Sequence, residues 1–125
     1  MSMNSDIKLQ TKIAGAALTI FRFVTLQTDG KYDPSGAGDV MDGICGETVT
    51  GDGKDFPMVL PNHSEAQVEA GGTIALGDYV ESDATGKAVT VVSGVGKGRA
   101  GKALEAAVSG DIMSIQFNVD TDEVA

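Results

Sequence analysis

The chain has 125 residues and a mass of 12.8 kDa, the size of one ordinary domain with one hydrophobic core. Its 9 Lys and Arg residues against 18 Asp and Glu residues give a net charge of −9, which argues against nucleic acid and anionic membranes as partners. Seventeen glycines, with 4 Phe, 2 Tyr and no Trp, indicate many tight turns rather than long helices.

The single cysteine and the single histidine limit the chemistry that the chain offers. With Cys45 alone, the chain forms neither an internal disulfide nor a complete cysteine-based zinc site. No nucleophile motif accompanies His63, so we interpret it as a loop residue. We therefore expect a protein that is not an enzyme and that holds no cofactor and no metal.

The N-terminal residues alternate between apolar and polar. Ile7, Leu9 and Ile13 share one parity, whereas Lys8 and Lys12 share the other, which is typical of extended backbone. This segment is an extended arm or an edge strand. No secretory signal precedes it, which favours synthesis in the cytoplasm.

Short strands separated by turns are predicted for the rest of the chain. The expected strands cover residues 21–26, 40–45, 79–82, 88–92 and 112–117. Turns are expected at Asp29-Gly30, Asp33-Pro34-Ser35-Gly36, Thr85-Gly86 and Ser109-Gly110-Asp111. Glycines from Gly94 to Gly101 predict a loop, residues 103–108 predict a strand or a very short helix, and residues 119–125 predict a frayed acidic tail.

An internal repeat relates the two halves of the chain. Phe23-Val24-Thr25 aligns with Tyr79-Val80-Glu81 at an offset of 56 residues. The stretch 43–47 aligns with 101–105 at an offset of 58, and Asp55-Phe56 aligns with Asp111-Ile112 at 56. Two such halves predict a small glycine-rich β-barrel or β-sandwich.

Two lookalike motifs point to other functions. The run from Gly96 to Gly101 matches the dinucleotide pattern GxGxxG, but no helix long enough to bind a phosphate follows it, so we interpret it as a loop between strands. The hairpin around Lys87 is similar to that of lipoyl and biotinyl carrier domains, whose modified lysine lies at an exposed turn. Gly86 takes the place of the acidic residue that precedes that lysine. A carrier domain or a small β-barrel binding module stays the alternative to a structural role.

A basic run interrupts the acidic sequence. Lys97, Arg99 and Lys102 place three of the nine cationic residues within six positions. Such a run is either a solvated surface or a contact for an acidic protein partner.

Three features together resemble a known family. They are the turn Gly77-Asp78-Tyr79-Val80, the hairpin turns at Asp29-Gly30 and Thr85-Gly86, and the stretch 103–107 followed by 109–115. Between about Ala17 and Asn118 the chain resembles the capsid cement, or head decoration, proteins of tailed bacteriophages. This resemblance implies a β-tulip-like structural protein, made in the host cytoplasm, that stabilises the outer surface of the virion. It also implies a homotrimer bound to the major capsid protein at threefold or quasi-threefold positions of an expanded capsid.

These inferences combine into one predicted organisation. We expect an N-terminal arm at 1–16, a β domain at 17–118 with repeats at about 17–62 and 74–118, and an acidic tail at 119–125. The arm is the predicted capsid contact, because its apolar residues would otherwise face water. Its candidate contact residues are Ile7, Lys8, Leu9, Lys12 and Ile13. Lys97, Arg99 and Lys102 are secondary candidates.

Overall fold

The structure, a computed structural model, describes residues 9–61, 65–91 and 97–122. Within these ranges the regular structure is entirely β, as the turn signals predict. The strands are β1 (Leu9–Ile13), β2 (Phe23–Leu26), β3 (Tyr32–Pro34), β4 (Gly43–Cys45), β5 (Asp55–Val59), β6 (Glu65–Glu69), β7 (Tyr79–Ser82), β8 (Ala88–Thr90), β9 (Lys97–Ala103) and β10 (Ile112–Asp122).

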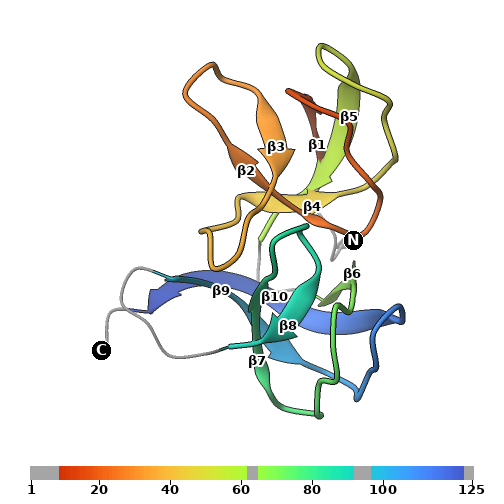
Figure 1. Cartoon of the computed structure of the whole chain (residues 1–125), viewed down its shortest axis with the longest axis vertical. Helices are drawn as coiled ribbons and strands as arrows, with labels where there is room; N and C mark the ends of the chain where they lie inside the picture. The colour runs from red at the N-terminus through yellow and green to blue at the C-terminus, as the bar shows by residue number, and fades with distance from the viewer. Residues whose placement is uncertain (1–8, 62–64, 92–96, 123–125) are drawn as a thin grey trace, which may run out of the picture.

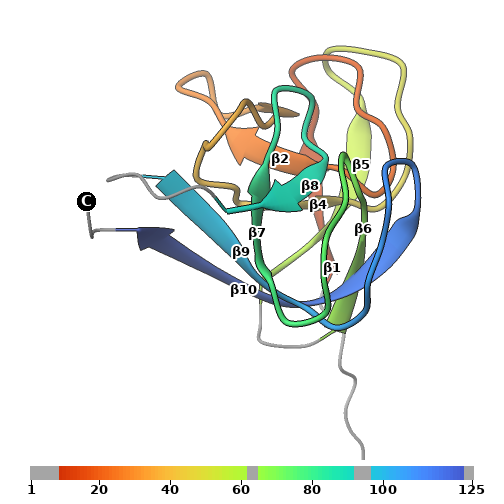
Figure 2. The same cartoon turned by 60° about the horizontal axis from the view of Figure 1, so that its bottom comes forward.

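Two antiparallel sheets carry these strands, the first above the second in Figure 1 and seen again in Figure 2. The strand order is β1-β5-β4-β2-β3 in the first sheet and β6-β10-β9-β7-β8 in the second. The second order is the first with every strand number raised by five, so the chain consists of two structural repeats. Neither sheet closes on itself, and the β-sandwich alternative of the predicted fold class is the one that the structure matches.

The pairing registers of the two sheets follow the offsets of the sequence repeat. Val24 pairs with Gly43 in the first sheet, and Val80 pairs with Gly101 in the second, which are offsets of 56 and 58. The predicted alignment of Asp55 with Asp111 is wrong by one position, because Asp55 pairs with Ile13 whereas Ile112 pairs with Glu69. The offset in the last strand is 57, since the loop before β10 is one residue shorter than the loop before β5.

The hydrophobic cores of the two repeats are joined by an aromatic residue of β2. In the first repeat, the ring of Tyr32 packs edge-on against Phe56, with centroids 5.9 Å apart. The position of Tyr32 is taken in the second repeat by Ala88, a much smaller residue. Phe23 lies in the same buried cluster as Ala88, and its ring centroid is 6.2 Å from that of Phe117. The first sheet therefore supplies part of the core of the second repeat.

Backbone hydrogen bonds fix the junction between the repeats. The Phe23 N–H donates to the carbonyl of Gly86 over 2.8 Å, and the Glu69 N–H donates to the carbonyl of Phe21 over 2.7 Å. Gly86 has a φ of +86°, and a Cβ at this position would lie 2.9 Å from the Phe23 carbonyl oxygen. Glycine is therefore required there by both its backbone conformation and the close approach of β2.

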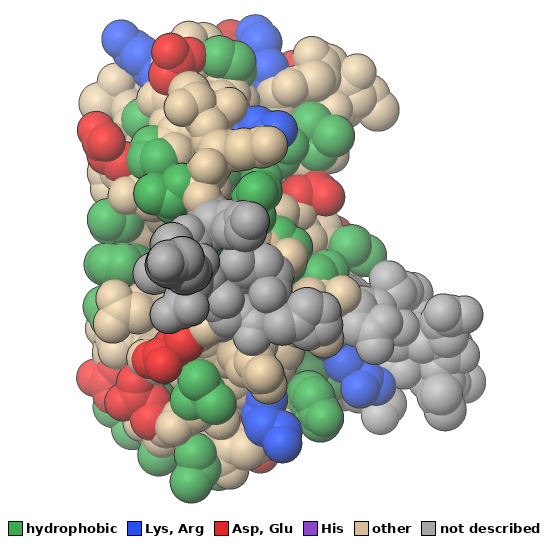
Figure 3. Space-filling view, turned by 180° about the vertical axis from the view of Figure 1, so that it is seen from behind, with side chains coloured by type: hydrophobic (Ala, Val, Ile, Leu, Met, Phe, Trp, Pro, Cys, Tyr) green, Lys and Arg blue, Asp and Glu red, His purple; other side chains and the backbone are tan. Residues whose placement is uncertain are grey.

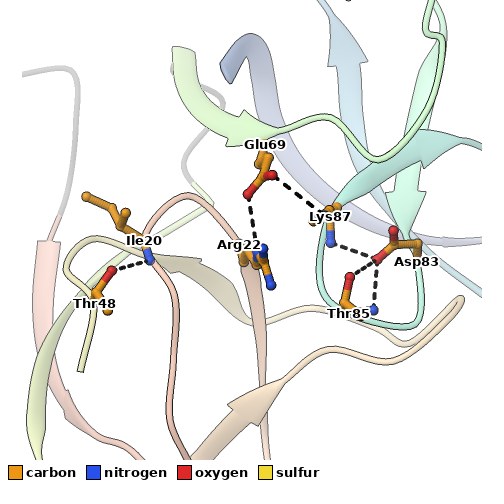
Figure 4. A network of polar contacts seen from close by, with 7 residues as sticks. All are labelled: Ile20, Arg22, Thr48, Glu69, Asp83, Thr85 and Lys87. Carbon is orange, nitrogen blue, oxygen red and sulfur yellow. Dashed lines mark hydrogen bonds and ion pairs between the residues drawn. The ribbon is translucent and has the colours of Figure 1, made fainter. Parts of the chain in front are cut away.

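An ionic network lies beside these backbone contacts (Figure 4). The Glu69 carboxylate accepts a hydrogen bond from Arg22 Nε over 3.3 Å and lies 3.7 Å from Lys87 Nζ. All three side chains are partly buried. Because Arg22 belongs to the first repeat and the other two residues belong to the second, the network ties the repeats together.

The predicted boundaries at both ends of the domain are wrong within the described residues. Leu9–Ile13, assigned to a separate arm, form β1 and pair with β5 along their full length. Their alternation is therefore that of an edge strand, the other interpretation that the pattern allowed. At the other end β10 continues to Asp122 and pairs with β9, so Val119–Asp122 are part of a sheet rather than a frayed tail.

The glycine-rich segment in the second half also differs from prediction. Lys97–Ala103 form β9, although a loop was expected up to Gly101, and the chain leaves the strand at Leu104, where a strand or helix was expected. Gly101 explains the first difference. Its φ of +119° and a register shift between β9 and β10 show a β-bulge, which glycine accommodates inside a strand.

Candidate functional site

One exposed face of the second sheet is the candidate site, with the β6 end of this face next to the first repeat. The pairing register aligns Tyr79, Lys102, Gln116 and Glu65 in one row across β7, β9, β10 and β6. All four residues are exposed, and Tyr79 retains 50% of its accessible surface. We call this surface the outer face.

Apolar side chains extend the outer face beyond this row. Leu104 follows Lys102 on the same side, and its N–H donates to the carbonyl of Ser114. Leu76 precedes β7 next to it, because the Gly77 N–H donates to the carbonyl of Ala103. Figure 3 shows hydrophobic side chains at the surface of the lower half, beside Lys and Arg side chains. The exposed large apolar residues of the second repeat are Leu76, Tyr79, Leu104, Val108 and Ile112.

A cation–π contact holds the aromatic residue of this face. The guanidinium carbon of Arg99 lies 5.7 Å from the centroid of the Tyr79 ring. Tyr and Arg are enriched among the residues that dominate the affinity of protein interfaces, because they combine a large contact area with hydrogen-bonding groups. The outer face thus has the composition of a protein-binding surface.

The part of the equivalent face that β2 and β4 form in the first sheet is buried inside the molecule. Phe23 and Ile44 are the counterparts of Tyr79 and Lys102 at offsets of 56 and 58, and they are 0% and 1% exposed. The second repeat covers them, as Phe23 and Ile44 belong to its core cluster. In the first repeat, this face therefore already packs against another β repeat, whereas in the second repeat the same face is open to solvent.

The predicted capsid contacts lie in and before β1. Ile7 and Lys8 fall outside the described residues. Leu9 and Ile13 are 58% and 39% exposed on the edge strand of the first sheet. Lys12 is on the opposite side of the strand, with its ammonium nitrogen 5.9 Å from the centroid of the Tyr32 ring. The structure thus brings Leu9 and Ile13 to one surface and separates Lys12 from them.

The predicted basic site is a segment of strand rather than a loop. The backbone register places Arg99 opposite Asp120 and Lys97 opposite Asp122. Lys102 instead has uncharged neighbours in register on both sides, Gln116 and Tyr79. Two residues of this basic run contribute to the outer face. Lys102 is part of it, and Arg99 contributes through its contact with Tyr79.

The carrier-like hairpin lies at the junction between the repeats. Thr85-Gly86 is a tight turn, as predicted, in which Asp83 accepts hydrogen bonds from the backbone of Thr85 and Lys87. The Lys87 side chain is only 28% exposed and pairs with Glu69. A carrier lysine has to reach distant active sites, so this environment argues against the carrier alternative.

Of the two residues considered for chemistry, the structure describes Cys45. His63 lies outside the described residues. Cys45 is buried, and its thiol donates to the carbonyl of Glu47 over 2.9 Å. Burial raises the pKa of the Cys45 thiol, and the nearby charge of Glu47 acts in the same direction. Across residues 9–61, 65–91 and 97–122, no three His, Cys, Asp or Glu side chains are placed to hold a metal ion. In the same ranges, no helix is long and apolar enough to cross a membrane.

A solved structure from a bacteriophage is similar to this chain. No protein-family model matches the sequence, and no curated protein matches it. The crystal structure of the head fibre gp8.5 N base of bacteriophage phi29 superimposes with a TM-score of 0.72. The fold is that of a phage head fibre base. The superposition covers 90% of this chain and 94% of the phi29 chain, at 19% sequence identity. The similarity therefore extends over both repeats and over nearly all of the phi29 base.

Proposed function

We propose that the protein is a structural component of a bacteriophage virion, which attaches to the outer surface of an expanded capsid and has no catalytic role. The observation that carries this proposal is the fold that the chain shares with the phi29 head fibre base over nearly the full length of both. The turn motifs that resemble phage head decoration proteins support the same role.

The physical properties of the chain suit such a role. A net charge of −9 keeps a protein that is made in many copies soluble before assembly. The outer face offers apolar and aromatic area for contact with other proteins. Attachment to a capsid needs a folded binding surface and no cofactor, so we propose synthesis in the host cytoplasm followed by assembly onto the particle.

We further propose that the protein binds as a homotrimer at threefold or quasi-threefold positions, with the major capsid protein as its partner. The proposed capsid contact is residues 1–8, which include Ile7 and Lys8. They precede an edge strand, β1, whose free edge is suited to continue a strand contact with another chain. The described pairing of β1 with β5 involves Leu9–Ile13, so we expect this pairing to survive removal of residues 1–8.

Reconstituted particles test the proposal. Expanded capsids from a phage that lacks this gene are mixed with the full chain or with a variant lacking residues 1–8, and are imaged by electron cryomicroscopy. We expect the full chain to add density in groups of three, and the truncated chain to unfold at the same denaturant concentration as the full chain but to leave capsids bare. Capsids that stay bare with the full chain would overturn the virion role, and density in single copies would overturn the trimer.

A further inference from the structure

We propose that copies of this protein contact one another head to tail, so that the outer face of one copy binds the first sheet of the next. The contact would use, between chains, positions equivalent to those that join the two repeats within one chain. It rests on the homotrimer of the proposed function and assigns the surfaces that form it.

The first argument comes from the receiving surface. Within the chain, the first sheet presents Phe23, Ile44 and Gly46 to the second repeat. Phe23 and Ile44 enter its core cluster, and Ile44 and Gly46 also line a cavity of about 380 Å³ that β6 borders with Glu65 and Gln67.

The counterparts of these first-sheet residues in the second sheet are Tyr79, Lys102 and Leu104. All three are exposed. The second sheet therefore presents the same positions to solvent.

The second argument comes from the residues of the second repeat that contact the first repeat. Glu65, Glu69 and Ser82 of the second repeat contact the first. Glu65 borders the shared cavity, Glu69 binds Phe21 and Arg22, and the carbonyl of Ser82 accepts a hydrogen bond from the Gly38 N–H.

The first-repeat counterparts of these three contact residues, all at an offset of 56, are Leu9, Ile13 and Leu26. Each is a large apolar residue that is exposed to solvent. The described chain exposes nine large apolar side chains, and five of them occupy positions whose counterparts contact the other repeat. These five are Leu9, Ile13, Leu26, Tyr79 and Leu104. Head-to-tail packing would bury both groups against each other.

Charge is balanced across this contact as well. Within the chain, Glu69 lies between the cations Arg22 and Lys87. Between copies, the three corresponding positions hold Ile13, Asp78 and Lys31. Ile13 takes the place of Glu69, so the central carboxylate is absent. Asp78 takes the place of Arg22, so Asp78 of one copy would face Lys31 of the next. The pair is complementary, as the contact requires.

The polarity of the outer face fits a contact that forms after folding. Phe23 and Ile44 are covered by their own chain, whereas Tyr79 and Lys102 must be soluble until another copy arrives. An interface between separately folded proteins typically has aromatic anchors and a polar rim. A head-to-tail contact is also the type that closes into a ring of three, because each copy offers one of each surface.

Chemical cross-linking of mixed single-cysteine variants tests the proposal. Phe23 lies beside Thr85 and Gly86 within the chain, so by equivalence Tyr79 of one copy should lie beside Asp29 of another. Tyr79→Cys and Asp29→Cys proteins are prepared separately, mixed at low concentration, assembled on capsids and treated with a short bismaleimide. Cys45 is buried, so the wild-type protein gives the background.

We expect a covalent dimer in the mixture and none above background with either variant alone. The matched control is a mixture of Tyr79→Cys with Asp111→Cys, an exposed position outside the proposed contact, which should stay unlinked. Linkage with Tyr79→Cys alone would show a symmetric contact and overturn the proposal. Decorated capsids without linkage in the mixture would also overturn it while the virion role stands. Head-to-tail linkage in solution without capsid binding would support the contact and refute the virion role.

Discussion

Replacement of Phe23 by alanine tests whether the two repeats fold as one unit. The side chain is fully buried and packs against Phe117. A buried phenylalanine removes roughly 150 to 250 Å² from water, which corresponds to about 4 to 6 kcal/mol, and measured Phe→Ala substitutions in cores cost about 3 to 5 kcal/mol. Because a domain of this size is stable by about 5 to 15 kcal/mol, Phe23→Ala should bring the whole chain close to unfolding.

The repeat supplies a matched control for this substitution. Tyr79 occupies the equivalent position and is half exposed, so Tyr79→Ala should cost the isolated chain about 1 kcal/mol, mostly from its contact with Arg99. Phe23→Leu, which keeps most of the volume, should lie between the two.

Equilibrium unfolding in urea, followed at a protein concentration where the chain is monomeric, gives these free energies. Equal losses for Phe23→Ala and Tyr79→Ala would refute the shared core, as would a Phe23→Ala protein in which the second repeat unfolds at its wild-type midpoint.

Three further predictions concern the ends, the bulge and the acidic turn. Deletion of residues 1–8 should leave the unfolding midpoint unchanged, whereas deletion of residues 1–13 removes β1 and should lower it clearly; equal midpoints for both would contradict the pairing of β1 with β5. Gly101→Ala should prevent folding or destabilise strongly because its Cβ would collide with the Gln116 carbonyl, while Gly30→Ala, also at positive φ but in open space, should cost about 1 kcal/mol in thermal unfolding. Burial acts to raise the pKa of Asp83, but the N–H groups of Thr85 and Lys87, the Thr85 hydroxyl and the Lys87 charge lower it below 3.8. The stabilisation from the Asp83 carboxylate is therefore present above the unfolded pKa and is lost as pH falls through the folded pKa. Asp83→Asn should be less stable than wild type at neutral pH and should lose less stability than wild type on acidification below about pH 4.

The repeat could be predicted from the sequence because it rests on local signals. Turn residues such as Asp29-Gly30 and Thr85-Gly86 require particular backbone conformations, and their spacing survives in the pairing registers. The same kind of signal fixed the strands Phe23–Leu26 and Tyr79–Ser82 to within two residues. These parts of the fold depend on neighbours in the chain, so the chain alone reveals them.

The orientation of β1 could not be predicted, because its alternating pattern allows either side of the strand to face the solvent. Alternation shows that Leu9 and Ile13 share a side, but not that this side faces outward while Lys12 lies near Tyr32. Phe21 is a second case. It adopts a φ of +67°, the left-handed conformation taken by its counterpart Gly77, and no local rule predicts a phenylalanine there. Contacts with residues distant in the sequence decide both.

The outer face was visible in the sequence only as its separate parts. Lys102 was noted as one of three cations and Tyr79 as part of a turn, but their alignment in one row depends on the pairing of β7 with β9. Comparison of equivalent positions was the available signal. Phe23 with Tyr79 and Ile44 with Lys102 are pairs in which the second repeat is the more polar, which separates a covered face from an open one.

This difference in polarity also sets an order of events. The face with Phe23 and Ile44 is apolar, so the second repeat has to cover it while the chain folds. The short connection between β5 and β6 keeps the second repeat close to this face. The face with Tyr79 and Lys102 tolerates solvent and is ready whenever a neighbour arrives. Under the proposed contact between copies, a single short chain would use equivalent positions twice, first during folding and later during assembly.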